Sequence, residues 1–371
     1  MDIVVISMAV LVVRCFARDR QGGRELSPRS QYGAHRVPES AFPDCPRLQN
    51  RTAIVTGASS GLGRAISVLY AREGANVVCA DLSPNVGGMH TKDELSGNEG
   101  GDTPTHELIE QQVGKGRATF VKVDVCDESS IEAMVAAAVE KYGRLDIIVN
   151  NAGITGVPKE NEEAFVNGAG LRLHETSTES FDLTIRINTR GLFLGCKHAI
   201  KQMLKQEPLE ANSRGDRTRG WIVNTASMLG LVAFPGVPAY VTSKHGAVGL
   251  TKQIAIDYAK DRIHCNALCP AFVDTPMTSK VIAGPIRHPL TAAHPCQTLG
   301  KPEDVARVAL FLVSEDAQWV TGVPMVIDGG VAETEGEEED VGNSTAQGSS
   351  CAGRKEQNVG DVGAFEREMG S

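Results

Sequence analysis

The stretch Thr56-Gly57-Ala58-Ser59-Ser60-Gly61-Leu62-Gly63 decides the fold class of this chain. It follows a short apolar run, Thr52–Thr56, and Arg64 opens a helical pattern. Glycines let the backbone turn sharply and approach a pyrophosphate closely, while the start of a helix presents free N–H groups and the positive end of its dipole. A glycine-rich string alone is weak evidence for a binding loop. Its position between a buried strand and a helix predicts a dinucleotide-binding loop.

Outward from this loop, short runs rich in valine and isoleucine alternate with helical stretches. The runs lack strict period-two alternation, which is typical of parallel strands buried on both faces. The predicted strands are Thr52–Thr56, Asn76–Ala80, Ala118–Val123, Ile147–Asn150, Trp221–Thr225, His264–Leu268 and Pro324–Ile327. The predicted helices are Arg64–Glu73, His106–Val113, Ser129–Tyr142, Thr178–Gln206, Ala239–Asp261 and Pro302–Ser314. This order predicts an α/β fold, doubly wound around a mostly parallel, seven-stranded sheet.

Three polar insertions interrupt the alternation: Pro84–Thr105, Gly156–Glu175 and Pro208–Gly220. We expect surface loops there, because they are rich in glycine, asparagine, proline or charge. The two ends of the chain, 1–47 and 332–371, carry no motif, and the second is acidic and then rich in glycine and serine. We expect both ends to be disordered around a single domain, residues 48–331.

The composition narrows the class of protein. Aromatic residues make up only 5% of the 371 residues and the net charge is −9, so no basic surface for a nucleic acid is expected. The nine cysteines are scattered without a CxxC pair. We interpret them as reduced thiols of a cytoplasmic protein and predict no metal site.

The N-terminal apolar run Ile3–Val13 is too short to span a bilayer and follows no basic residue that would suit a secretory signal. Six arginines between residues 14 and 36 suggest a mitochondrial presequence. A disordered extension or a mis-assigned start is the favoured interpretation. We therefore expect a cytoplasmic location and no membrane partner.

Polar residues after the later strands complete a pattern. Asn150-Asn151-Ala152-Gly153 ends the fourth strand, Asn188 lies in the next helix, and Ser227 follows the fifth strand. Tyr240 and Lys244 form a YxxxK sequence that starts thirteen residues after the serine. Together with TGxxxGxG, this set resembles the short-chain dehydrogenase/reductase family over most of the chain. The resemblance implies a Rossmann fold and NAD(P)-dependent oxidoreductase activity.

The resemblance assigns four catalytic residues, Asn188, Ser227, Tyr240 and Lys244. Tyr240 would exchange a proton with the substrate oxygen, and Ser227 would hydrogen-bond that oxygen. Lys244 would also hold the nicotinamide ribose, and Asn188 would support a water that leads protons outward. Tyr240 and Lys244 are four apart, so they share one face of a helix. Since an ammonium and a cationic nicotinamide both favour a phenolate, we expect the pKa of Tyr240 to fall from about 10 toward the working range.

The same resemblance gives the residues that would bind the cofactor. They are Gly57, Ser59, Ser60, Gly61, Leu62, Gly63, Asp81, Asp124, Val125, Asn151, Ala152, Gly153, Tyr240, Lys244, Pro270, Val273 and Thr275. Asp124 would flank the adenine, or merely end its strand, and Thr275 would meet the nicotinamide carboxamide. Ala271 stands where the family usually has a glycine.

Asp81 favours NAD as the cofactor. It follows the second strand, 18 residues after Gly63, near the spacing at which a carboxylate accepts hydrogen bonds from the adenosine ribose. The same carboxylate would repel the 2′-phosphate of NADP. Arg64 is the one base nearby, and we expect it to face solvent or the pyrophosphate. NADP stays open as the second cofactor.

We therefore expect an NAD(P)-dependent enzyme that interconverts a secondary alcohol and a ketone. An NADPH-dependent ketoreductase of a biosynthetic pathway is the alternative, and a catalytically silent cofactor-sensing or scaffold protein is a more remote one. The family's substrate segment corresponds to Met277–Thr298, whose apolar stretches favour an apolar or cyclic alcohol. The insertion Gly156–Glu175 either roofs the same cleft or is a surface loop.

The two longest predicted helices favour self-assembly, because each is apolar around much of its circumference and the sheet covers only one side. The apolar residues are Leu192, Phe193, Leu194, Ile200, Met203, Val248, Leu250, Ile254 and Ile256. In the family these helices pair between subunits. We expect a homodimer or a homotetramer.

Overall fold

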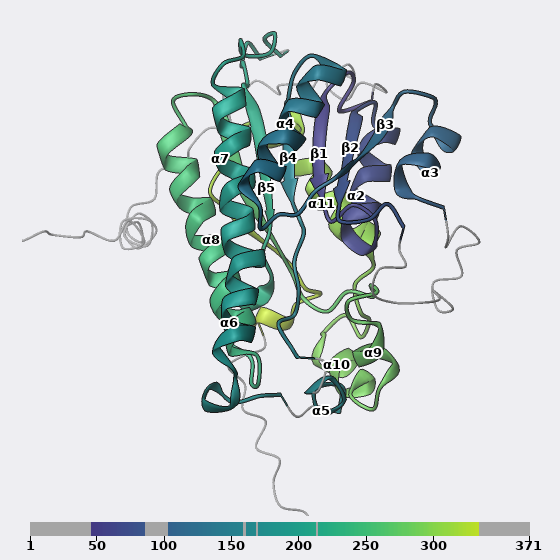
Figure 1. The fold of residues 1–371 in the computed structure, drawn as a ribbon, viewed down its shortest axis with the longest axis vertical. Coiled ribbons are helices and arrows are strands. Elements are labelled where there is room, and N and C mark those ends of the chain that lie inside the picture. Colours follow the sequence, from purple (N-terminus) through teal and green to yellow (C-terminus); the bar gives the residue numbers. More distant parts are fainter. Residues whose placement is uncertain (1–45, 86–102, 159–160, 168–169, 213, 334–371) are drawn as a thin grey trace, which may run out of the picture. The chain divides into compact units, whose positions relative to one another are not determined.

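The computed structural model describes residues 46–85, 103–158, 161–167, 170–212 and 214–333. Within them, seven strands pair in parallel into one sheet in the order β3-β2-β1-β4-β5-β6-β7 (Figure 1). The strands are β1 (Thr52–Thr56), β2 (Asn76–Asp81), β3 (Ala118–Lys122), β4 (Ile147–Asn150), β5 (Gly220–Thr225), β6 (Ile263–Pro270) and β7 (Pro324–Ile327). Every residue of β1, β4 and β5 is buried, which explains why these strands read as unbroken apolar runs. The predicted doubly wound sheet is confirmed.

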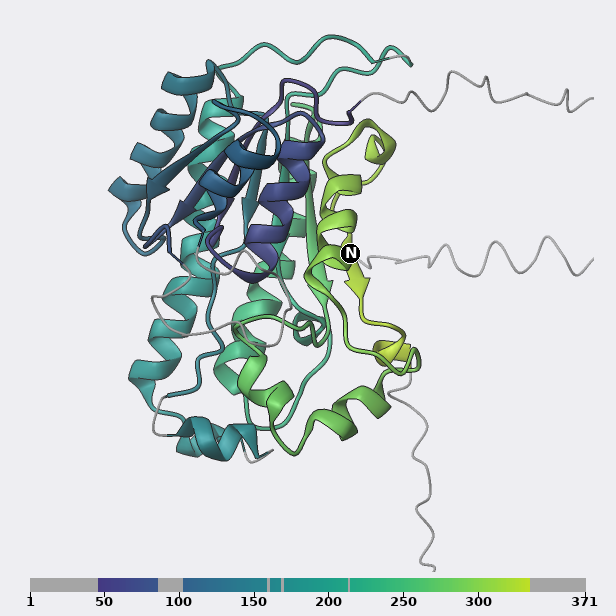
Figure 2. The ribbon, with the colours of Figure 1, turned by 90° about the vertical axis from the view of Figure 1, so that its right-hand side faces the viewer.

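Helices cover both faces of this sheet. On one face α4 (Glu128–Tyr142), α7 (Leu192–Met203) and α8 (Pro238–Tyr258) share a core with Ile54 and Ile148. On the other, α2 (Gly61–Arg72) and α11 (Pro302–Leu312) lie side by side over Val55 and Val149 (Figure 2). Successive residues of β1, such as Ile54 and Val55, therefore pack into two separate cores on opposite faces of the sheet. Full burial of one such side chain contributes about 1.5–3 kcal/mol.

The order of the strands reverses between β1 and β4. These two strands are neighbours, with Val55 opposite Val149, although three helical crossovers separate them along the chain. In an open α/β sheet, ligands bind beyond the carboxyl ends of the strands at such a reversal. The loops after Thr56 and Asn150 therefore mark the place to search for a site.

The helix predicted over Thr178–Gln206 is interrupted. The structure has α6 (Thr178–Ile185), a π-helical turn at Arg186–Gly191, and then α7. Within this turn the side chain of Asn188 bonds to groups on two other segments. Single π-helical turns are rare and often lie at functional sites, and the sequence analysis did not predict this one.

Other helices lie where no helix was predicted. They are α5 (Glu162–Val166), in the insertion Gly156–Glu175, and α9 (Ser279–Ala283) and α10 (Arg287–Ala293), in the predicted substrate segment. The three gather at one end of the sheet (Figure 1). They have at most seven residues each, too few for an amphipathic period to be recognised. The helix predicted over His106–Val113 is present as α3 (Thr105–Gln112), which begins at the last residue of the first insertion.

The burial of α7 and α8 changes the argument for assembly. Leu192, Leu194, Ile200, Met203, Val248 and Ile254 are buried within the chain. The expectation that these six need a partner's cover is wrong, because the sheet and the neighbouring helices already cover them. Phe193 and Ile256 are 47% and 76% exposed.

Most of the two predicted terminal extensions lies outside the described residues. At the end of the first extension, the N–H of Arg47 donates to the carboxylate of Glu73 (2.9 Å). At the start of the second, the N–H of Ala332 donates to the carboxylate of Asp328 (2.7 Å). Of the insertion Pro84–Thr105, residues 86–102 also lie outside. Among the residues described, no helix is both long and apolar enough to cross a membrane.

Candidate active site

The glycine-rich loop after β1 is shaped for a ligand that must approach the backbone. Gly57 and Gly61 have φ angles of +67° and +49°, which disfavour other residues. A Cβ on Gly63 would lie 2.1 Å from the carbonyl oxygen of Gly57, so the first turn of α2 packs directly on the loop. The helix begins at Gly61, three residues before its predicted start, and its N-cap residue Ser60 makes no side-chain cap. Its first N–H groups can therefore bind an anion, which fits a pyrophosphate.

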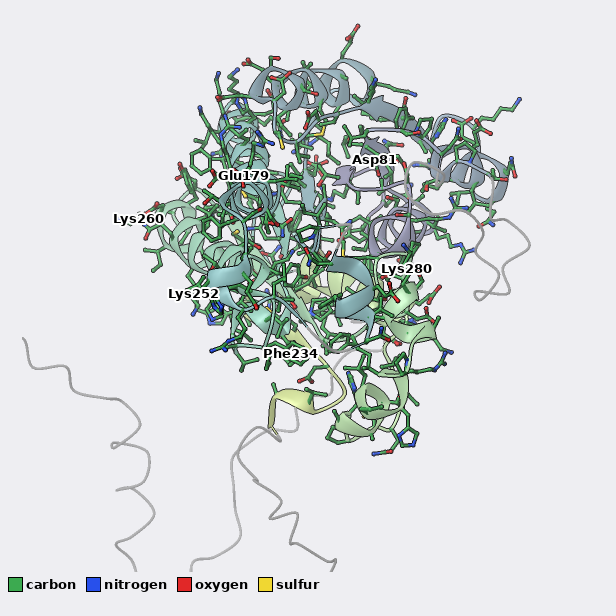
Figure 3. All side chains as sticks on the ribbon, turned by 60° about the horizontal axis from the view of Figure 1, so that its bottom comes forward. Asp81, Glu179, Phe234, Lys252, Lys260 and Lys280 are labelled. Carbon is green, nitrogen blue, oxygen red and sulfur yellow. The ribbon has the colours of Figure 1, made fainter. Side chains whose placement is uncertain are left out.

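Asp81 is held against this loop at the end of β2 (Figure 3). Its carboxylate accepts one hydrogen bond from the N–H of Ser59 (3.0 Å) and one from the N–H of Leu82 (2.8 Å). The Ser59 hydroxyl in turn donates to the carbonyl of Ser83 (2.5 Å). Each carboxylate oxygen keeps further lone pairs, and Asp81 is partly exposed, so it can also accept from a ribose.

Arg64 does not take the position that we expected from the sequence. Its guanidinium is half-buried and donates to the carbonyl of Thr103 (2.8 Å) and to the hydroxyl of Thr105 (3.3 Å). Thr105 also donates to the carbonyl of Ala58 (2.8 Å). The end of the first insertion is thereby anchored to the glycine-rich loop, a contact between distant segments that the sequence does not reveal.

The end of β4 is hydrogen-bonded to the end of β1. The hydroxyl of Thr56 accepts from the N–H groups of Asn151 (2.9 Å) and Ala152 (3.1 Å), and the Asn151 side chain donates to the Thr56 carbonyl (3.1 Å). Sequence reasoning missed the role of Thr56, although it opens the TGxxxGxG string. A Cβ on Gly153 would lie 3.1 Å from Asn188 Oδ1 and 3.7 Å from Lys244 Nζ. The strand end thus lies directly beside two of the predicted catalytic residues.

Three of the predicted catalytic side chains meet where β5 ends and α8 begins. Lys244 Nζ lies 5.4 Å from the centre of the Tyr240 ring and donates to the carbonyl of Thr225 (2.8 Å). The hydroxyl of Ser227 accepts from the N–H of Leu229 (3.2 Å) and donates to the carbonyl of Pro270 (3.4 Å). The Ser227 hydroxyl also lies close enough to the Tyr240 phenol to lower the pKa of that phenol.

The fourth residue, Asn188, lies behind them. Its amide donates to the carbonyl of Ile154 (2.9 Å) and to the hydroxyl of Ser243 (3.0 Å), and it accepts from the N–H of Ile154 (2.9 Å). The π-helical turn provides this geometry. Asn188 therefore joins the loop after β4 to the helix that carries Tyr240.

The electrostatics differ from our expectation for Tyr240. Burial raises the pKa of its phenol to about 12, and the nearby Ser227 hydroxyl only partly opposes this effect. Burial likewise lowers the pKa of the Lys244 ammonium to about 8. The predicted fall in the pKa of Tyr240 is therefore wrong for the chain alone, because desolvation of the phenolate dominates.

The remaining predicted cofactor residues lie on two other loops. Gly61 and Thr275 are neighbours, since a Cβ on Gly61 would lie 3.4 Å from the Thr275 Cβ. Val273 is buried and bridges to Gly300, while Pro270 ends β6.

After β3, the Asp124 carboxylate accepts from the N–H of Cys126 (2.9 Å), and Val125 contacts the π-helical turn at Gly191. Asp124 thus forms a turn, which supports the simpler of its two interpretations. Its predicted contact with adenine stays a prediction.

Comparisons with known proteins show which proteins this chain is similar to. A family model described as "Enoyl-(Acyl carrier protein) reductase" matches residues 57–332. A 2-(R)-hydroxypropyl-CoM dehydrogenase of Xanthobacter autotrophicus is 40% identical, over 76% of this chain and 98% of its own length. The 3-oxoacyl-[acyl-carrier-protein] reductase FabG of Thermotoga maritima is 34% identical, over 77% and 99%. The crystal structure of a levodione reductase, 30% identical, covers 78% of this chain and all of its own with a TM-score of 0.63.

Proposed function

Since the chain belongs to the short-chain dehydrogenase/reductase family of oxidoreductases, we propose that it interconverts a secondary alcohol and a ketone with NAD as its preferred cofactor. One observation carries the proposal. Tyr240, Lys244 and Ser227 meet at the carboxyl edge of the sheet, next to the loop after β4 and on the side of the glycine-rich loop. A proton donor and a site for a dinucleotide therefore share one edge.

The residues present fit a dinucleotide. The close contact between Gly63 and Gly57 leaves no room for side chains, and the first turn of α2 offers N–H groups to the pyrophosphate. Asp81 would accept from the adenosine ribose, and Thr275, beside Gly61, would lie at the nicotinamide end. The bound cofactor would accept or supply the hydride.

The protein's own part is to position the substrate oxygen and move one proton. In ketone reduction the Tyr240 hydroxyl would donate its proton to that oxygen, and the Ser227 hydroxyl would donate a hydrogen bond to it. The Lys244 ammonium would stabilise the phenolate that remains. Asn188, bonded to the Ile154 carbonyl, would hold the backbone around a path for the returning proton.

The preference for NAD rests on Asp81. Its two oxygens are fixed toward the loop by the N–H groups of Ser59 and Leu82, so its negative charge cannot easily turn away from a 2′-phosphate. Arg64 is bonded to Thr103 and Thr105. We infer a preference for NAD over NADP of at least about tenfold in kcat/KM, which corresponds to about 1.4 kcal/mol.

A panel of secondary alcohols tests the proposal. Cyclic, steroid-like and polyketide-like alcohols would be incubated with NAD or NADP, and the reduced cofactor measured, with Tyr240→Phe as the inactive control. Oxidation of at least one alcohol that depends on Tyr240 supports the proposal. If no alcohol or matching ketone reacts although the cofactor binds, the silent cofactor-sensing alternative replaces it.

The second candidate is the NADPH-dependent ketoreductase. The names of the relatives include both a dehydrogenase and a reductase, so they do not favour one direction. Tighter binding of NADPH than of NADH in a fluorescence titration would favour this candidate.

We also propose a homodimer or homotetramer in the cytoplasm. The exposed Phe193 on α7 and Ile256 on α8 support the assembly. Light scattering at micromolar concentration tests it, and the mass of one 39.5 kDa chain would refute it.

A further inference from the structure

We propose that Phe165 and Leu171, from the insertion Gly156–Glu175, form a fixed apolar wall of the substrate site and limit the size of the alcohol or ketone that it accepts. This inference rests on the proposed function, because it concerns the substrate of the same site. The sequence left two interpretations open for this segment, a roof over the substrate cleft or a surface loop, and we adopt the first and name the residues.

An apolar cluster borders the catalytic tyrosine. Met228, Leu229 and Val237 are buried together in a group separate from the two cores of the sheet. Both Tyr240 and Phe165 pack against this group. A substrate whose oxygen is at the Tyr240 hydroxyl must place its carbon groups among such neighbours.

The insertion is attached at both of its ends. At its start, the carbonyl of Gly156 accepts from the hydroxyl of Ser180 on α6 (2.7 Å). Near its end, the N–H of Leu171 donates to the carbonyl of Gly236 (3.0 Å). A Cβ on Gly170 would lie 2.4 Å from the Cα of Gly236, so the two backbones touch. Gly236 lies four residues before Tyr240, and this contact fixes the insertion against the entry to the catalytic helix.

The middle of the insertion contacts the predicted substrate segment. A Cβ on Gly284, which follows α9, would lie 2.8 Å from a methyl group of Val166 on α5. The insertion therefore bridges α9 and the loop before α8, and α5 lies beside α9 at this end of the sheet (Figure 1).

The space left between the insertion and the start of α8 is small. A cavity lies between the insertion and the start of α8, and Phe165, Leu171 and Val237 line it. Its volume is about 10 Å³, enough for roughly one water molecule. A second ring on the substrate could not enter here while Phe165 and Leu171 are in place.

Competition between two ketones tests the wall. The ratio of kcat/KM for 1-decalone, which has two fused rings, to that for cyclohexanone would be measured in Phe165→Ala, Leu171→Ala and the unaltered chain. Leu173→Ala is the matched control, because Leu173 lies in the same insertion but is 74% exposed. We expect at least about a tenfold rise in the ratio for Phe165→Ala, a smaller rise for Leu171→Ala and no change for Leu173→Ala. An unchanged ratio in the first two variants would overturn the inference.

A binding measurement separates this inference from the proposed activity. In Phe165→Trp, titration with cyclohexanone, whose single ring the proposed wall admits, should quench the new indole saturably in the presence of NAD. Leu173→Trp should show only linear collisional quenching. Both variants retain Trp221 and Trp319, so their difference reports on position 165. Saturable quenching without turnover would support the wall while the proposed activity fails. Linear quenching in both variants would refute the wall even in an active enzyme.

Discussion

The half of the site that faces the cofactor and the half that faces the substrate are built by different means. The first consists of loops that follow buried strands, held by hydrogen bonds such as that from the N–H of Asn151 to the hydroxyl of Thr56 and by the close packing of Gly57 and Gly63. The second consists of short helices and the insertion Gly156–Glu175, held by apolar contacts and by the meeting of Gly170 with Gly236. Backbone geometry restricts the sequence tightly, whereas apolar packing accepts many sequences. The sequence therefore predicts the half that faces the cofactor and does not predict the half that faces the substrate.

Tyr240 lies where the two halves meet, and its loss has the largest expected effect. Tyr240→Phe removes the proton-transferring hydroxyl and keeps the ring, so kcat should fall by at least about a thousandfold while NADH still binds. Steady-state rates and a fluorescence titration check both parts. Tyr258→Phe, on the same helix, is the control and should stay active. Near-normal kcat for Tyr240→Phe on any accepted alcohol would contradict the role.

The cofactor half should not tolerate even one added methyl group at Gly63. A Cβ there would lie 2.1 Å from the carbonyl oxygen of Gly57, which forces the first turn of α2 away from the loop. Gly63→Ala should weaken NADH binding by about a hundredfold, or about 2.7 kcal/mol. Gly249→Ala is the control, because Gly249 is also helical and a Cβ there meets nothing within 4 Å. Equal affinities in the two variants would remove the glycine-rich loop from the binding site.

The sequence predicted the sheet well and the surroundings of the site poorly. The bounds of β1, β4 and β7 match their predicted ranges. β1 and β4 are buried throughout and therefore need apolar runs, whereas β7 is a partly exposed edge strand. The predicted tetrad also converges on one edge of the sheet. The bonds of Arg64 to Thr103 and Thr105 join segments about 40 residues apart, and no local pattern encodes them. The raised pKa of Tyr240 likewise depends on burial by several elements at once.

Cofactor choice should be reversible within the cofactor half alone. Asp81 supports the loop through the N–H of Ser59, so Asp81→Asn, which keeps an acceptor, is a better test than alanine. Leu82 is 62% exposed and can be replaced by arginine. The double variant Asp81→Asn with Leu82→Arg should reduce the preference for NAD by about tenfold or invert it. Relative kcat/KM with NAD and NADP is the measurement, with Leu82→Ala as the control. A preference unchanged by the double variant would remove Asp81 from the ribose site.

The smallest expected effect is the decrease in the free energy of unfolding that the buried charge of Lys244 causes. Its side chain is only 4% exposed, and burial lowers the pKa of its ammonium from 10.5 to about 8. Between these two values the unfolded chain binds the proton and the folded chain does not. The unfolded state thus binds more protons there, and the contribution of Lys244 to the free energy of unfolding rises with pH. Below pH 8 the folded chain holds the charged ammonium, so the full free-energy cost of burying it lowers stability. As the pH rises toward 10.5 the folded chain holds the neutral amine, and this cost disappears.

Lys244→Met removes this charge and keeps most of the side-chain volume. Methionine also leaves the carbonyl of Thr225 without its donor, which costs about 1 kcal/mol at every pH. Because the cost of the lost hydrogen bond does not depend on pH, the pH dependence of the stability difference reports on the charge of Lys244 alone. In urea unfolding, the stability of the unaltered chain relative to the variant should rise by about 1 kcal/mol or more between pH 8 and pH 10, whatever the variant's catalytic loss. Because the two proteins share every other titrating group, parallel pH profiles would mean that the pKa of Lys244 is not lowered in the folded protein.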